Sequence, residues 1–476
     1  MKNWLSPSRL LLVERFLWAA VLVALPVTSF RFLPFFGDAQ VRPLSFVPAS
    51  LLFLLVLWRS FRERKLVFWT PSLLLLLVFA LIAVVSTAWG ALLSPPDLHN
   101  HTYLARSLRA WITFFVGLLF LLVSISQARG EDDLKFTFKW LYIGLVGHVA
   151  VSLLQLVEIH ITSVIFENAP LGNVVDAFQK TIMMAGISPN KRISGLTLEP
   201  SWLAAQIAVL YLPWVVGSLL TGYRLFKRRF VTLLLFLGLL VFALLTYSRS
   251  GFAVIILASF LTAWITRRGW IPNVKIWFHS PFGQSDTYHP RRTLNIALRL
   301  LVVVVILTGL ASLGVALSAN NYFAVLWKSD STGLIDYFVD IYAGPRLAYA
   351  FAGWNVFTQH PWFGVGLGGA GLYLHAAMPN WAHFNISEVS QIFSSDYMGY
   401  PNVKNLFVRL LAETGIAGCW AFLSFYLLML GKTLKALKSR EKVLMFMGST
   451  GLFSFIAILA IGFSLDAFAM PMIWIP

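Results

Sequence analysis

Apolar runs of about 20 residues recur along most of this 476-residue chain. An α-helix of that length crosses a hydrocarbon core about 30 Å thick. Hydrophobic residues make up 58% of the chain and charged residues 12%, whereas a soluble domain has roughly 45–50% and about 25%. A water-soluble core cannot absorb that excess of apolar side chains. We therefore predict an all-α, polytopic membrane helix bundle that forms a single integral membrane domain over residues 1–476.

The apolar pattern predicts about eleven transmembrane helices, whose boundaries follow from where each run begins and ends. The first run is interrupted by Arg31 and Pro34, and the second is short and contains two prolines, so either could be tilted or re-entrant. No A-x-A-like cleavage site follows the first run, which we interpret as a retained helix. The predicted spans are residues 16–36, 43–58, 67–89, 107–126, 136–157, 198–221, 230–246, 251–266, 297–318, 405–431 and 443–465.

The formal net charge of +17 is unevenly distributed along the chain. With the N-terminus in the cytoplasm, the inner segments hold 25 of the 37 lysines and arginines but only 7 of the 20 acidic residues. This asymmetry is the positive-inside pattern of membrane proteins. The basic excess therefore reflects topology and lipid headgroups, and we predict no nucleic-acid partner.

Two outer segments interrupt the regular alternation of spans, at residues 158–197 and 319–404. Connections of that length usually carry function. The apolar stretches of the outer loop 319–404 are too short to span, which predicts short helices on or in the outer leaflet. Cys419 is the single cysteine, so no intrachain disulfide or cysteine-based zinc site can form. The outer histidines show no convergent spacing, and we predict no metal and no cofactor.

Lys191 and Arg192 precede Glu199 and Pro200 at the outer start of the sixth predicted span. Pro200 suits the first turn of a helix, and Glu199 suits the positive end of the helix dipole, so helix capping can explain Glu199 and Pro200. Capping leaves the two cations unexplained. A polar site at the membrane surface is the alternative.

Arg249 lies in a tight outer turn between two strongly apolar spans. Its side chain could simply extend to lipid headgroups. A guanidinium fixed at the outer interface, close to helix-start amides, is also a good phosphate ligand. The substrate implied would be a lipid phosphate. Arg346, which follows Gly344 and Pro345 in the outer loop, is a second outer arginine.

The outer loop next carries Trp354 and His360, followed by a glycine-rich run that ends at Gly369. No strand precedes these glycines and no βαβ unit surrounds them, which excludes a dinucleotide fingerprint. Close backbone packing, or a turn under a bound ligand, explains the glycines better. Trp354 and the other outer aromatics could stack on sugar rings or form an interfacial aromatic belt.

The last polar stretch, Lys404 and Asn405 followed by Arg409 and Glu413, enters the tenth predicted span. Arg409 and Glu413 are four residues apart, so one helix face carries both charges inside the bilayer zone. They form either a mutually neutralising structural pair or part of a site that faces a polar cavity.

These stretches, in this order, resemble the O-antigen polymerase and O-antigen ligase (Wzy-like) superfamily over residues 190–420. The resemblance rests on Arg-x-Ser-Gly with Glu-Pro-Ser-Trp, the Ser-Arg turn, the His-Pro loop with Gly-x-Gly, and the Asn-x9-Gly helix. It implies a bacterial inner-membrane enzyme that transfers glycans from undecaprenyl pyrophosphate on the periplasmic face, without metal or nucleotide. The implied partners are the lipid-linked oligosaccharide, membrane lipids, a chain-length regulator and a flippase.

The same resemblance suggests roles for the polar residues. Departure of a pyrophosphate needs charge neutralisation, which preorganised arginines and lysines supply. We predict as catalytic residues Lys404, Arg249, Arg346, Glu413 and Glu199, and as substrate-binding residues Lys191, Arg192, Asn405, Arg409, Trp354 and His360.

One departure bears on the reaction: ligases of the superfamily carry His-Asn where this chain has Lys404 and Asn405. Lysine is normally protonated at neutral pH and binds phosphate rather than accepting a proton. We therefore favour a polymerase, with Glu413 or Glu199 accepting the proton. Ligation to lipid A core or to protein is the enzymatic alternative. A flippase or secondary transporter is an alternative of another class, although transporters place polar groups near the midplane rather than at the outer surface.

Overall fold

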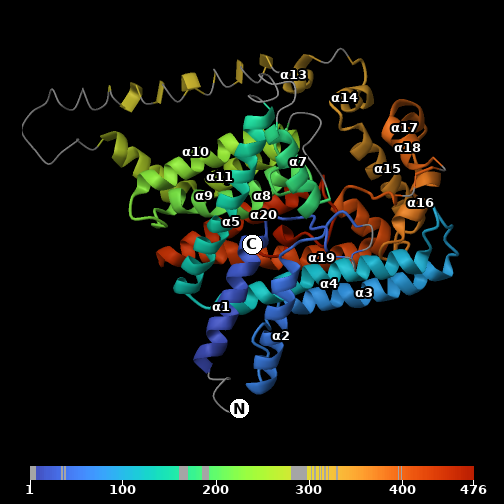
Figure 1. Cartoon of the computed structure of the whole chain (residues 1–476), viewed down its shortest axis with the longest axis horizontal. Helices are drawn as coiled ribbons and strands as arrows, with labels where there is room; N and C mark the ends of the chain where they lie inside the picture. The colour runs from blue at the N-terminus through green and yellow to red at the C-terminus, as the bar shows by residue number, and fades with distance from the viewer. Residues whose placement is uncertain are drawn as a thin grey trace, which may run out of the picture.

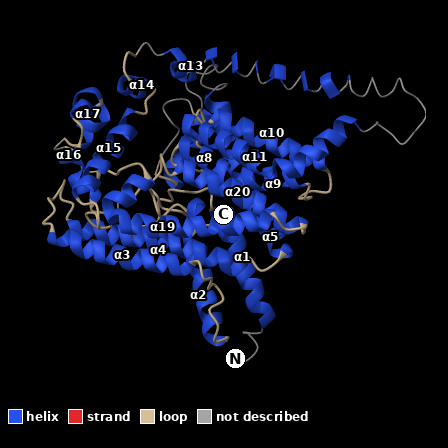
Figure 2. Cartoon of the chain, turned by 180° about the vertical axis from the view of Figure 1, so that it is seen from behind, coloured by secondary structure: helices blue, strands red, loops and turns tan. Residues whose placement is uncertain are grey.

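The computed structural model describes residues 7–33, 36, 39–159, 170–184, 192–279, individual positions between 297 and 319, 321–328, 331–394, 396–397 and 399–476. Within these residues the regular elements are helices, accompanied by three isolated β-bridges. Figure 2 shows helices and loops in every described part of the chain. The prediction of an all-α fold is confirmed for these residues.

Seven helical segments are long and apolar enough to cross a membrane, which supports a multi-pass membrane protein. Each corresponds to one of the predicted spans. They are α3 (Leu73–Leu92), α4 (Tyr103–Gln127), α5 (Glu131–Val157), the segment Pro200–Thr221, α11 (Arg249–His279, apolar to Pro272), α19 (Leu406–Leu437) and α20 (Lys442–Ile461).

The other predicted spans differ from the structure or are not fully described. The first was predicted at residues 16–36, but α1 spans Pro7–Ala24, and residues 29 and 30 beyond it form β-bridges with residues 42 and 183. The helices α2 (Phe46–Arg62) and α10 (Arg229–Leu245) each have 17 residues, the lower limit for a span. The ninth predicted span, 297–318, lies partly outside the described residues. The expected number of eleven is therefore not confirmed.

The segment Pro200–Thr221 forms the centre of the bundle. It consists of α8 (Pro200–Gln206), the π-helical turn η3 (Ile207–Tyr211) and α9 (Leu212–Thr221). In its most apolar stretch of 18 residues, 83% of the residues are buried. Pro213 has no N–H to donate to the carbonyl of Val209 one turn earlier. The hydroxyl of Ser454 on α20 donates to that carbonyl instead, at 3.2 Å. Carbonyls within a bilayer need such a donor.

Short helices follow α11, and the later ones gather at one end of the bundle. They are α13 (Asn321–Lys328), α14 (Leu334–Asp340), α15 (Gly344–Gln359), α16 (Ala370–Ala377), α17 (Asn380–Asn385) and α18 (Ser387–Ile392). Figure 1 shows α15 to α18 at the end where α3 and α4 are joined. They have a hydrophobic cluster of their own, in which Tyr349 and Leu374 pack with Val403 and Ala412. Another helix, α7 (Pro170–Ile182), precedes the polar stretch that contains Lys191, Arg192 and Glu199.

The C-terminal segment turns back into the bundle after α20 (Figure 1). It contains the short 3-10 helix η4 (Pro471–Ile473), and its Phe468 and Trp474 are buried. The Trp474 indole N–H donates to the carbonyl of Phe468 at 2.7 Å. A side chain at Gly117 on α4 would collide with this indole ring. The segment therefore fills the space beside α4 and places Asp466 near the start of α19.

Candidate functional site

Arg192 joins the loop that leads to Glu199 with the turn that carries Arg249. Its Nε donates to the carbonyl of Thr246 at the end of α10, at 2.9 Å. The loop beneath Arg192 is anchored to α5, because the Gln155 side-chain oxygen accepts from the amides of Ser194 and Gly195 at 3.0 and 2.8 Å. The loop is thus held against the turn that carries Arg249. The other predicted cation of this stretch, Lys191, lies outside the described residues.

Glu199 occupies the N-cap position of α8, yet its carboxylate does not cap the helix. It accepts a hydrogen bond from the hydroxyl of Ser201 at 3.0 Å, and the residue is exposed. α8 packs closely against the start of α11, since a side chain at Gly251 would collide with Ala204. Capping therefore does not account for Glu199, whose carboxylate is accessible beside the helix that begins at Arg249.

Arg249 joins the start of α11 to the end of α14. Its Nη1 donates to the carbonyl of Ile341 at 2.5 Å, and its guanidinium lies 5.9 Å from the centre of the Tyr342 ring. The side chain thus binds a protein carbonyl instead of extending only toward headgroups. Because Ile341 ends α14, this contact brings the start of α15, and with it Arg346, toward the turn.

Arg346 lies in the first turn of α15 and is only partly buried. It forms no hydrogen bond or ion pair with any residue that the structure describes. The positive end of the α15 dipole adds to its charge. An open cavity of about 780 Å³ has Lys328, Asp336, Asp340 and Tyr342 in its lining, and Tyr342 precedes Arg346 by four residues. A partly exposed cation without a protein partner among the described residues can bind an anionic ligand.

Lys404 joins α15 and α18 to the start of α19. Its ammonium forms an ion pair with Glu388 on α18 and lies 4.7 Å from the centre of the Tyr349 ring on α15. Its backbone has a left-handed φ of 58°, and its amide donates to the Asp466 carboxylate at 3.1 Å. Sequence reasoning missed both acids. The signal for Asp466 was available, because it is the lone charge in residues 443–476.

Asn405 caps α19 in the structure. Its side-chain oxygen accepts from the amides of Phe407 and Val408, at 3.0 and 3.2 Å. Two of the amides that the first helical turn leaves without partners are thereby satisfied. Helix capping is enough to explain why an asparagine occupies position 405. Substrate binding by Asn405 stays a prediction.

Arg409 and Glu413 form a buried ion pair on one face of α19. The Arg409 Nε lies 3.1 Å from the Glu413 carboxylate, with the side chains 12% and 5% exposed. Arg409 also donates to the carbonyl of Asp466 at 2.5 Å, and the Gly368 amide contacts the Glu413 carboxylate. This arrangement favours the structural pair over a carboxylate that is open to substrate.

The glycine-rich loop after His360 docks onto a break in α19 at Gly415, where φ is 65° and ψ is −171°. The break removes the helical donors of two carbonyls, and the loop replaces them. Val365 donates to Ala412, and Gly366 donates to Glu413, both at 2.9 Å. In return, the amide of Ile416 donates to the carbonyl of Pro361 at 2.9 Å. The loop and the broken helix therefore form one structural unit.

Three glycines of this loop have backbone conformations that favour glycine. Gly364, Gly366 and Gly368 have φ values of 65°, 90° and 82°. A side chain at Gly364 would collide with the α19 backbone, and one at Gly366 or Gly368 would collide with Tyr103 or Arg106 of α4. Close backbone packing, one of the two explanations offered by the sequence, is confirmed by these contacts.

Arg106 on α4 is a further candidate that sequence reasoning did not single out. Its guanidinium stacks on Tyr400, and its Nε is buried without an acceptor among the described residues. The Arg409 and Glu413 charges act on it electrostatically. The sequence did offer a signal for Arg106, which lies in the first turn of an apolar helix. A charge at such a position is costly unless it is paired or has a function.

The structure does not bring every predicted residue to this cluster. Trp354 is 47% exposed, and its ring centre lies 5.2 Å from that of Phe357. The His360 ring lies 6.1 Å from the Tyr373 ring. No hydrogen bond joins either side chain to the described cations of the polar stretches. Among the described residues, no group of three or more His, Cys, Asp or Glu side chains could hold a metal ion.

Comparison with known proteins connects this cluster with a family. Residues 233–423 match the family model described as O-antigen ligase. The match includes Arg249, Arg346, Lys404, Arg409 and Glu413, and it begins after the loop with Arg192 and Glu199. No curated protein matches the chain.

Proposed function

We propose that this protein is an inner-membrane polysaccharide polymerase, because residues 233–423 match the family model described as O-antigen ligase. It transfers an undecaprenyl-pyrophosphate-linked glycan onto a second lipid-linked repeat unit on the periplasmic face. The product is the polymer of an O-antigen, capsule or exopolysaccharide.

The observation that carries this proposal is the chain of contacts among the outer cations. Arg192 binds the turn before Arg249, Arg249 binds the carbonyl before α15, and Arg346 begins that helix. Lys404 reaches the same helix through Tyr349. Arginines and lysines held by a rigid scaffold are suited to a pyrophosphate, whose charge they neutralise without reorganising during the reaction.

In the proposed reaction, a hydroxyl of the acceptor sugar attacks the anomeric carbon of the donor glycan. The new carbon–oxygen bond forms as the bond to pyrophosphate breaks, and undecaprenyl pyrophosphate leaves with the electron pair. Arg346 and Arg249 stabilise that leaving charge. Glu199 accepts the proton of the hydroxyl, because its carboxylate is exposed, whereas Glu413 is buried and paired with Arg409. The cavity beside Tyr342 is suited to glycan hydroxyls.

The ion pair of Lys404 with Glu388 supports a polymerase over a ligase. A lysine held between a carboxylate and an aromatic ring serves as a cation, so it does not supply the base that a histidine would provide at this position. The cation instead contributes to phosphate binding.

Reconstitution of the purified full-length protein with a lipid-linked repeat unit as the sole substrate tests this proposal. A polymerase lengthens the lipid-linked glycan, which a ladder on a gel reveals, whereas a ligase stays inactive until lipid A core or protein is added. A flippase forms no glycosidic bond under either condition. Absence of a ladder, with transfer to lipid A core alone, would overturn the polymerase in favour of the ligase.

Arg346→Ala tests the role of the outer cations in the same assay. Loss of an electrostatic donor to a leaving group lowers the rate by about a hundredfold, and Arg346→Lys recovers little of it because the bidentate geometry is lost. The control is Lys180→Ala, which removes an exposed cation of α7 that pairs with Asp176. Equal activity of both alanine variants would exclude Arg346 from the site.

A further inference from the structure

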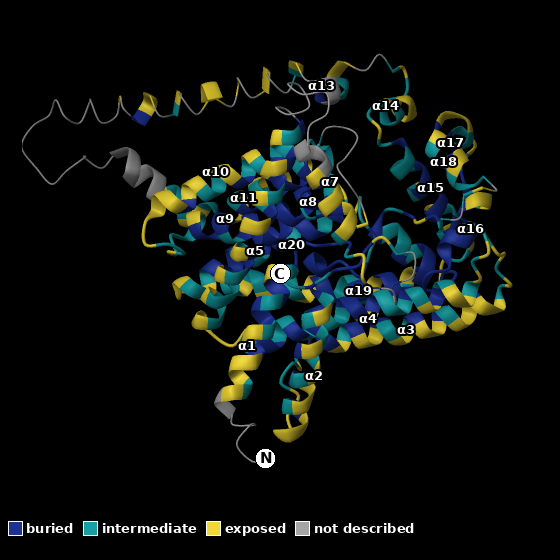
Figure 3. Ribbon diagram, viewed as in Figure 1, coloured by how far each residue is buried: buried dark blue, intermediate teal, exposed yellow. Residues whose placement is uncertain are grey.

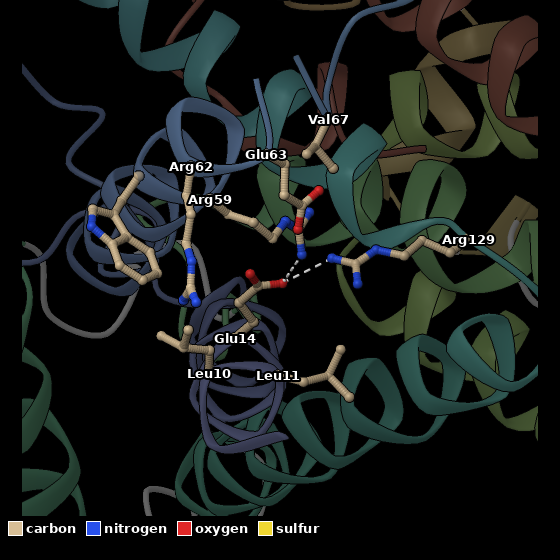
Figure 4. A pocket seen from close by; sticks show the side chains of 9 residues that line it. Leu10, Leu11, Glu14, Arg59, Arg62, Glu63, Val67 and Arg129 are labelled. Carbon is tan, nitrogen blue, oxygen red and sulfur yellow. Dashed lines mark hydrogen bonds and ion pairs between the residues drawn. The ribbon is translucent and has the colours of Figure 1, made fainter. Parts of the chain in front are cut away.

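A second cavity lies where α1, α2 and the connection between α4 and α5 meet, far along the chain from every residue of the catalytic proposal. Its volume is about 490 Å³, and Figure 4 shows the side chains that line it, among them Glu14, Arg59, Arg62 and Arg129. The charged residues come from segments 1–15, 59–66 and 127–139, which the positive-inside pattern places in the cytoplasm. The cavity is therefore on the side opposite to the polar stretches.

Two arginines share a single carboxylate in this cavity. The Glu14 side chain is 4% exposed and accepts from Arg59 Nη1 at 2.5 Å and from Arg129 Nη2 at 2.8 Å. Figure 4 shows both guanidinium groups directed at that carboxylate. Three arginines and two glutamates line the cavity, so its formal charge is +1. The two carboxylates together therefore leave one positive charge of the cavity uncompensated.

Arg59 also holds unused donors. Its Nε and Nη2 are buried, and neither finds an acceptor among the described residues. A buried charged donor without an acceptor is costly, so an anionic ligand that satisfies these groups would be stabilising. Arg62 lies beside it, with its guanidinium 5.5 Å from the Trp58 ring. The cavity thus offers two guanidinium groups to one ligand.

The apolar lining distinguishes a lipid from a soluble anion. Leu10, Leu11 and Trp58 form part of the wall, and Leu11 and Trp58 are 40% and 38% exposed. Figure 3 shows exposed residues along α1 and α2, which lie at the edge of the bundle. Such surfaces accommodate acyl chains while basic side chains bind the headgroup.

We propose that this cavity is a binding site for an anionic phospholipid. The phosphodiester oxygens accept from Arg59 and Arg62, whose planar guanidinium groups match phosphate geometry. The acyl chains lie along Leu11 and Trp58. A basic cavity between helices on the cytoplasmic side is the arrangement that recognises lipid phosphates.

Native mass spectrometry of the detergent-purified full-length protein, titrated with phosphatidylglycerol, tests this site. The wild type binds the lipid saturably and prefers it to phosphatidylcholine. Arg62→Gln lowers the affinity by about fivefold, the effect of one basic side chain at an anionic surface. The matched control is Arg64→Gln, which removes the same charge from an exposed position of the same turn outside the cavity.

Glu14→Gln separates lipid binding from a purely structural ion-pair network. It removes the competing carboxylate from Arg59 and Arg129, so phosphatidylglycerol binds more tightly even though the protein melts at a lower temperature. A purely structural network would lose thermal stability with no gain in lipid affinity, which would overturn the proposal. Equal losses in Arg62→Gln and Arg64→Gln, or equal binding of phosphatidylcholine, would do the same. Displacement of the lipid by millimolar inorganic phosphate would show that the site takes free phosphate instead.

Discussion

The guanidinium carbon of Arg106 lies 3.5 Å from the centre of the Tyr400 ring. This contact joins the N-terminal end of α4 to the segment that leads into α19. The Tyr400 hydroxyl donates to the carbonyl of Gly368 at 2.8 Å, so the same ring also holds the glycine-rich loop. Burial raises the pKa of Tyr400 above its ordinary value, and the hydroxyl therefore keeps the proton that it donates.

Tyr400→Phe and Tyr400→Leu separate the two functions of this ring. The phenylalanine variant keeps the face for Arg106 and loses one hydrogen bond, worth about 1 kcal/mol. We expect it to retain most glycan transfer. The leucine variant also loses a cation–π contact worth about 2 kcal/mol, so we expect activity to fall at least tenfold. Transfer assays and thermal denaturation in detergent measure both effects, and equal activity of the two variants would contradict a role for the Arg106 contact.

Lys404 distinguishes a cation from a base. Lys404→Arg keeps a positive charge beside Glu388, so we expect partial transfer activity although an arginine cannot act as a base. Lys404→His is not expected to restore full activity. Reconstituted transfer with the lipid-linked donor measures both variants. An inactive arginine variant together with a fully active histidine variant would identify position 404 as the base and remove the argument for a polymerase.

Gly366→Ala tests the docking of the loop onto α4 and α19. Alanine at a positive φ costs roughly 1–2 kcal/mol, and its side chain would also collide with Tyr103. We expect a lower melting temperature and loss of transfer. Gly147→Ala in α5 is the control, because a side chain there meets no atom within 4 Å. An alanine in that helix is neutral or slightly stabilising. Similar melting temperatures for the two variants would show that the packing at Gly366 is not tight.

Thiol labelling tests the orientation of the chain. In a Cys419→Ala background, which removes the buried native cysteine, Ser390→Cys reports on α18 and Arg268→Cys on the C-terminal half of α11. Both positions are exposed. In intact spheroplasts an impermeant thiol reagent is expected to label only position 390. Labelling of position 268 alone would invert the topology and move the proposed catalytic site to the cytoplasmic side.

The sequence by itself determined the helical membrane architecture, because a span needs a long apolar run wherever it crosses lipid. Seven of the predicted spans follow from that requirement alone. The Arg409 and Glu413 pair was equally predictable, since residues four apart share a helix face. The ends of α1 could not be predicted from the sequence, because the irregular segment after Ala24 pairs with the distant residues 42 and 183.

Which charges meet depends on how the helices pack. Glu388 beside Lys404, Asp466 beside Arg409 and Tyr400 beside Arg106 are all contacts between different segments. Helical periodicity relates residues within one helix, and it contains no information on how separate helices pack in a bilayer. The break of α19 at Gly415 has the same origin: the carbonyls it exposes are stable only because the loop after His360 supplies their donors.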